Sequence, residues 1–89
     1  MTLIVKREGH KEAYDERKVY GSCYASVLNT HKSKEDAEDT CGAVVAVLAE
    51  RIAKKKEITS KEIFHHMCEI MERYDKDAAF MYKTHKDLS

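Results

Sequence analysis

Residues 2–15, with the sequence TLIVKREGHKEAYD, are expected to form a β-hairpin at one end of the fold. Two short strand-like stretches flank Glu8 and Gly9, and a glycine supplies the positive φ that a tight hairpin loop requires. A two-residue loop would place six side chains on one face of this hairpin: Leu3, Val5, Arg7, His10, Glu12 and Tyr14. Lys6 would then lie across from Lys11, whereas a bulge or a longer loop would change this register.

The rest of the chain has the apolar periodicity of four helices, over about 15–30, 34–55, 59–74 and 75–86. Asp15 and Asp75 are suited to cap the first and last helices, and capping-box patterns begin at Ser33 and Thr59. The side chains expected to face the core are Val19, Cys23 and Val27; Ala37, Cys41, Val44, Val45, Leu48 and Ile52; Ile63, Met67, Ile70, Met71 and Tyr74; and Ala78, Met81, Tyr82 and His85.

The short segment 57–59 is suited to join the hairpin as a third strand. A lone hairpin and a lone amphipathic helix are both marginal in water, so the apolar faces must cover one another. The economical arrangement is a single α+β domain spanning 1–89, in which a small sheet packs on one end or side of a helical bundle.

The composition excludes several classes of function. Lys and Arg number 16 and Asp and Glu also number 16, so there is no excess positive charge to attract nucleic acid over the whole surface. Gly9, Gly21 and Gly42 are too widely spaced for a Walker-A loop or a dinucleotide fingerprint. No apolar run approaches the roughly 18 residues of a membrane span, and the N-terminal apolar stretch is too short for a secretory signal.

The three cysteines, Cys23, Cys41 and Cys68, are odd in number and form no CxxC motif. This pattern favours buried thiols in a reducing, cytoplasmic compartment over a disulfide framework or a zinc ribbon. His65 and Cys68 could supply half of a zinc site, but no second ligand pair accompanies them, so we expect no metal centre. No nucleophile elbow or metalloprotease spacing occurs, and we expect neither catalytic residues nor enzyme activity.

An anion site is indicated at the start of the first helix. With Asp15 as the cap, Lys18 falls at the third helical position, where the positive end of the helix dipole disfavours a lysine and attracts anions. Lys6 and Arg7 come from the adjacent hairpin, and the three cations together are suited to bind phosphate. The alternative is that all three are ordinary solvated surface charges.

Three segments resemble the ATP-cone domain, in the family's order and over nearly the whole chain. Residues 5–19, VKREGHKEAYDERKV, followed by Ser22, resemble its opening V-x-K-R-[DE]-G-x-x-[EQ]-x-[FY]-D-x-x-K-[IV], with the spacer before Lys6 compressed to two residues. Residues 58–63, ITSKEI, resemble the family's [IV]-[ST]-S-x-[ED]-I, and residues 79–86, AFMYKTHK, resemble its closing A-x-x-Y-x-x-[YH]-[RK]. The first match is the specific one.

This resemblance implies a three-stranded sheet capping a four-helix bundle, and reversible binding of ATP or dATP without hydrolysis. It implies that the backbone of Val5 to Arg7 and the side chain of Glu12 contact the adenine. It also implies that Lys6, Arg7 and Lys18 match positions that contact base, sugar or phosphates, and that Ser60 matches a hydroxyl position lining the pocket. Lys83 and Lys86 are further candidate phosphate ligands, or else part of a solvated face.

Phe64 departs from the family pattern, because many reductase cones carry there a polar residue that helps to distinguish ATP from dATP. Phenylalanine cannot form such a hydrogen bond, so its ring either fills the core, which we favour, or stacks on a base. ATP-versus-dATP discrimination is therefore not expected from this position.

The expected function is that of a stand-alone, non-catalytic allosteric module that binds ATP or dATP, with Mg²⁺ carried on the triphosphate. Its output would be a partner protein such as ribonucleotide reductase, or self-association into a homo-oligomer. The main alternative is a DNA-associated transcriptional regulator, similar to the cone-containing repressor of reductase genes but lacking its zinc ribbon. The presence of Lys6, Arg7, Glu12 and Lys18 disfavours an inert interaction domain. The lack of a general base, a pair of metal-binding acids or a phosphate loop disfavours a small phosphotransferase.

Overall fold

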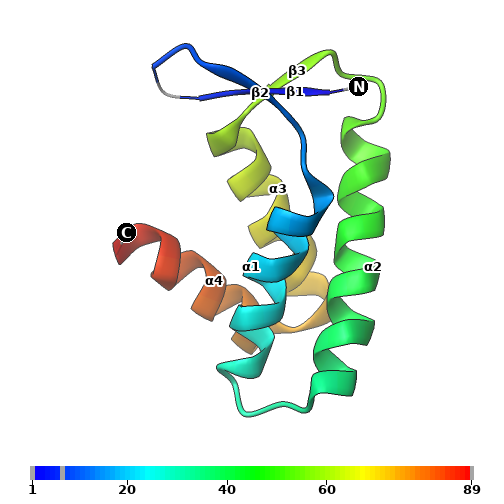
Figure 1. Ribbon diagram of the computed structural model, residues 1–89. Helices are drawn as coiled ribbons and strands as arrows, with labels where there is room; N and C mark the ends of the chain where they lie inside the picture. Colours follow the sequence, from blue (N-terminus) through cyan, green and yellow to red (C-terminus); the bar gives the residue numbers. More distant parts are fainter. Residues whose placement is uncertain (1, 7, 89) are drawn as a thin grey trace.

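A computed structural model describes residues 2–6 and 8–88 of the chain, with side chains as far as residue 85. The described residues form a small sheet above a bundle of helices, which confirms the predicted α+β fold (Figure 1). The elements are β1 (Leu3–Val5), β2 (Lys11–Ala13), α1 (Glu16–Leu28), α2 (Lys34–Ile52), β3 (Glu57–Thr59), α3 (Ser60–Tyr74) and α4 (Lys76–Leu88). In Figure 1, α1, α2 and α3 run side by side below the sheet, and α4 leaves the lower end of α3 at an angle.

The sheet has the strand order β2-β1-β3. β1 pairs antiparallel with β2 and parallel with β3, so the predicted third strand is present. A parallel pair needs a crossover connection, and here the two helices α1 and α2 provide it. Ile4, in the centre of β1, lies opposite Glu12 of β2 and Ile58 of β3.

The predicted hairpin register is wrong by one residue. Lys6 N–H donates to the carbonyl oxygen of His10 at 2.7 Å, and Gly9 N–H donates to the carbonyl oxygen of Lys6 at 2.9 Å. The connection therefore has three residues, and Gly9 takes the left-handed conformation, with φ +86°, that such loops require at their last position. Lys6 lies across from His10 rather than from Lys11, and Ile4 shares the inward face with Glu12.

The helix starts follow the predicted caps. The Asp15 carboxylate accepts from the backbone N–H of Arg17, and the Ser33 hydroxyl accepts from the N–H of Asp36. Thr59 and Glu62 form a complete capping box, in which each side chain accepts from the backbone N–H of the other residue. The helices α1 and α2 end at Leu28 and Ile52, a few residues before their predicted ends near 30 and 55.

The core contains all six residues predicted for α2, together with Cys23 and Val27 of α1 and Met67 of α3. Two predicted core residues are exposed. Tyr74 keeps 51% of its surface accessible because it is the last residue of α3, at the corner where the chain turns into α4. His85 is exposed because α4 packs on the bundle through Ala78, Ala79 and Tyr82, nearer its start.

A buried carboxylate holds the lower end of the bundle together. The ammonium of Lys32, in the α1–α2 connection, donates to Asp75, whose side chain is only 6% exposed. Asp75 also accepts from the N–H of Ala78, which caps α4, and its own N–H donates to the carbonyl oxygen of Met71 at the end of α3. One residue thereby ties the α1–α2 connection to the junction between α3 and α4.

We expect Asp75 to make the stability depend on acid pH. Burial alone would raise its pKa, but the Lys32 ammonium and the backbone N–H groups hold the pKa of Asp75 below its ordinary value. A carboxyl whose pKa is lower in the folded state than in the unfolded state stabilises the fold when it is ionised. This stabilisation is complete above the unfolded-state pKa of about 3.9 and is lost as pH falls through the folded-state pKa. The Asp75→Asn variant should therefore melt several degrees lower at pH 7, with a shallower fall in melting temperature between pH 5 and 3. Parallel pH curves for the two proteins would contradict this role.

Candidate functional site

A pocket of about 300 Å³ lies beneath the sheet, where the hairpin meets the first turns of α1 and α3. Its lining combines charged side chains from the hairpin and the start of α1 with apolar side chains from the sheet and from α1, α3 and α4. The residues are Ile4, Lys6, Glu12, Ala13, Asp15, Lys18, Val19, Ser22, Ser60, Ile63, Phe64 and Tyr82. Pockets that bind small ligands have this mixture of a mostly apolar wall and a few placed polar groups.

The fold brings four of the sequence-predicted site residues to this pocket: Lys6, Glu12, Lys18 and Ser60. Val5 lies one position from Ile4 in β1, so its side chain takes the opposite face of the sheet. Lys83 is exposed on α4 and is not one of the lining residues. Arg7 and the side chain of Lys86 lie outside the described part of the chain.

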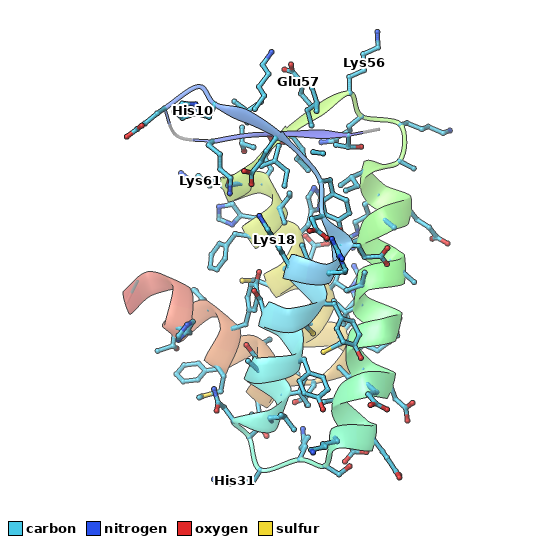
Figure 2. All side chains as sticks on the ribbon, viewed as in Figure 1. His10, Lys18, His31, Lys56, Glu57 and Lys61 are labelled. Atoms are coloured by element: carbon cyan, nitrogen blue, oxygen red, sulfur yellow. The ribbon has the colours of Figure 1, made fainter. Side chains whose placement is uncertain are left out.

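The charged end of the pocket is organised around one carboxylate oxygen. Glu12 Oε1 lies 3.2 Å from the Lys6 Nζ and 4.0 Å from the Lys18 Nζ. Figure 2 shows Lys18 pointing from the first turn of α1 up toward the sheet. All three side chains are partly exposed, Lys18 most of all at 73%. Two ammonium groups from separate elements thus converge on a single anionic atom at the mouth of the pocket.

Local structure explains this convergence. Glu12 is held opposite Ile4 by the strand register, so its side chain extends below the sheet toward the helices. Lys18 occupies the third position of α1 because Asp15 is the cap, and its N–H donates to the Asp15 carbonyl oxygen at 3.2 Å. Hydrogen bonds from Arg17 to the Asp15 carboxylate lower the pKa of that carboxyl, which therefore stays ionised as a cap. Lys18 consequently lies at the positive end of the α1 dipole.

An aromatic pair forms the opposite wall. The rings of Phe64 and Tyr82 stack with centroids 5.7 Å apart and planes 19° from parallel. Tyr82 is buried, and burial raises the pKa of its phenol well above the ordinary value. Phe64 is half-buried and packs against the core while lining the pocket. The favoured core interpretation of Phe64 is therefore incomplete, because one part of the ring faces the pocket.

The sequence pattern places Tyr82 only in the core and misses its position in the pocket wall. No local signal marks this second role, because it depends on the packing of α4 against α3. Asp15 and Ser22 also line the pocket. The sequence indicates Asp15 as a cap and Ser22 as part of the opening motif, but their positions at the pocket follow only from the placement of the hairpin over α1.

A second pocket, of about 350 Å³, lies between α1 and α4 and shares Ser22 and Tyr82 with the first. Among the side chains of residues 2–6 and 8–85, no three of His, Cys, Asp or Glu are grouped so as to hold a metal ion. None of the helices in the described part of the chain combines the length and the apolar character that a membrane crossing demands.

The sequence matches no model of a known protein family and no curated protein.

We expect the site charges to contribute little to folding. Replacing Glu12 with Gln removes a carboxylate from two exposed ion pairs, and such pairs are worth about 1 kcal/mol or less. The matched control is Ile4→Ala, in the residue directly opposite Glu12, where loss of a buried side chain should cost about 2–4 kcal/mol. Urea unfolding of both variants measures the difference. A cost for Glu12→Gln equal to that of Ile4→Ala would show that Glu12 is primarily a structural residue.

Proposed function

We propose that this chain is a non-catalytic regulatory domain of the ATP-cone type, which binds ATP or dATP reversibly in the pocket beneath the sheet. The observation that carries the proposal is the convergence of Lys6 and Lys18 on Glu12 beside an apolar pocket with an aromatic wall. Adenine nucleotides require both parts of this arrangement, because they join a flat, largely apolar base to a strongly anionic phosphate chain.

The two lysines would bind phosphate oxygens. In the nucleotide-free protein their partner is the Glu12 carboxylate, and phosphate would replace it as the anion at the same ammonium groups. Arg7, Lys83 and Lys86 are candidate additional cations, and the Ser60 hydroxyl, in the first turn of α3, is a further candidate donor. Each charge-assisted hydrogen bond of this kind is worth about 1.5–3 kcal/mol.

The base would lie deeper, against the apolar wall formed by Ile4, Ala13, Val19 and Phe64. Glu12, freed from the lysines, would accept a hydrogen bond from the adenine amino group, with the hairpin backbone around Val5 supplying further contacts. Mg²⁺ would arrive coordinated to the triphosphate. Phe64 has no hydrogen-bonding group, so the site would bind ATP and dATP alike at that position.

The response to the nucleotide would be a change of shape or association state, acting on a cytoplasmic partner such as ribonucleotide reductase or through a homo-oligomer. A nucleotide can shift such an equilibrium only by binding one state more tightly than the other. The DNA-associated alternative would need a local basic surface, because the formal net charge is zero. A salt-dependent gel shift on duplex DNA would favour that alternative.

We expect Lys18→Gln to weaken ATP binding about tenfold or more while leaving the apo melting temperature almost unchanged. The variant loses one charge-assisted phosphate contact, whereas the lysine itself is exposed and disfavoured by the helix dipole. The control is Lys34→Gln, which removes a lysine from the first turn of α2, at the end of the bundle far from the pocket. Titration calorimetry should measure the ATP affinity of the wild type and of both variants. Equal ATP affinity in both variants would remove Lys18 from the site.

We also expect selectivity for adenine. Guanine presents a carbonyl oxygen where adenine presents its amino group, so an acceptor would face the Glu12 carboxylate. A lost or repulsive buried hydrogen bond costs about 1–3 kcal/mol, which is roughly tenfold to a hundredfold in affinity. Thermal-shift measurements with ATP, dATP and GTP, with and without Mg²⁺, test this directly. Equal stabilisation by GTP and ATP would contradict the base contact.

A further inference from the structure

Two thiols meet in the centre of the helical core. Cys23 lies in the middle of α1 and Cys41 in α2, and both side chains are fully buried. The Cys41 Sγ lies only 2.6 Å from the Cys23 Sγ. Heavy atoms that merely pack together stay about 3.5–4.0 Å apart, whereas sulfur atoms joined in a disulfide are about 2.05 Å apart.

We propose that Cys23 and Cys41 form a reversible disulfide when the protein meets a small peroxide, and that this bond locks α1 to α2. In the structure both residues are thiols. The two cysteines lie 18 positions apart in the chain, on adjacent helices, and their sulfurs are nearer to a disulfide bond length than to ordinary packing distance. This proposal stands on the helix packing and is independent of nucleotide binding.

Either sulfur can begin the reaction, because both are fully buried and each has the other as its nearest sulfur. The thiolate is the reactive form of cysteine, so the thiol that loses its proton first attacks the oxidant.

The reaction balances with hydrogen peroxide alone. The first thiolate attacks one oxygen of the peroxide, the O–O bond breaks, and hydroxide leaves with a proton from solvent, so that this cysteine becomes a sulfenic acid. The sulfur of the second cysteine then attacks the sulfenic sulfur, the S–O bond breaks, and the oxygen leaves as water with the proton of the second thiol. Two thiols and one peroxide give one disulfide and two waters. A dithiol reductant reverses the modification by thiol–disulfide exchange.

Burial restricts which oxidants can act. Neither sulfur is accessible at the surface, so a molecule near the size of water reaches the pair more readily than a bulky disulfide reagent. Cys68 of α3 is only partly buried and provides a comparison within the same chain. The expected product is therefore an internal Cys23–Cys41 bridge, formed faster with hydrogen peroxide than with an aromatic disulfide reagent.

The test uses the full chain, reduced and then treated with excess hydrogen peroxide before the remaining thiols are alkylated. Peptide mapping should recover a Cys23–Cys41 cross-linked peptide, and the intact protein should lose the mass of two hydrogen atoms. The melting temperature should rise by several degrees, because the bridge constrains the unfolded chain, and dithiothreitol should restore the original value.

Variants give the controls. Cys68→Ala should form the bridge as wild type does, whereas Cys41→Ala should show neither the cross-linked peptide nor the rise in melting temperature. If Cys41→Ala does not fold, the peptide maps of the wild type and of Cys68→Ala still show whether the Cys23–Cys41 bridge forms. Cross-links through Cys68, or oxidation of Cys41 to sulfinic acid without a bridge to Cys23, would overturn the proposal.

Discussion

The parallel pairing of β1 with β3 is the constraint on which the rest of the structure depends. Ile4 and Ile58 lie opposite each other and are both buried, so the inner face of the sheet closes the upper end of the core. The Thr2 hydroxyl, itself buried, donates to two carbonyl oxygens at and just after the end of α2. The residue that precedes β1 is thereby bonded to residues 50 and 53 positions further along the chain. The helices α1 and α2 must pack within the segment that this contact closes.

This pairing also creates the candidate site. β2 leads into α1 through the Asp15 cap, and β3 leads into α3 through the Thr59 cap. Because β2 and β3 are held on either side of β1, the first turns of both helices lie below the same small sheet. The pocket occupies the space where strands end and helices begin, and Lys18 and Ser60 reach it from those two first turns.

The sequence predicts the elements well and their tertiary relations less well. The caps at Asp15, Ser33 and Thr59 depend on a few adjacent residues, so local pattern suffices to find them. The predicted hairpin register is wrong because a two-residue and a three-residue loop both place Gly9 at a position of positive φ. The hydrogen bond from Lys6 N–H to the His10 carbonyl oxygen distinguishes them, and it exists only in the folded hairpin. Tyr74 has the spacing of a core residue and is exposed because α3 ends there.

For the candidate site too, the sequence predicts local features better than contacts between elements. Helix position alone identifies Lys18, since the cap determines its place at the third residue of α1. The approach of Lys18 to Glu12 depends on the strand register. The sequence indicates both residues as site residues but predicts that register incorrectly. Phe64 and Tyr82 form a wall only because α4 packs on α3, and this is a contact between elements that no local pattern encodes.

The packing of α4 bears on local opening of the molecule. Among its side chains as far as residue 85, those of Ala78, Ala79 and Tyr82 are buried, and Phe80 beside them is 67% exposed. Elements that bury few apolar groups exchange their amide hydrogens through local unfolding, at a lower free energy than the global transition. Release of α4 would withdraw Tyr82 from Phe64 and leave one wall of the pocket uncovered. Hydrogen exchange in α4 thus reports on the integrity of the pocket while α1, α2 and the sheet remain folded.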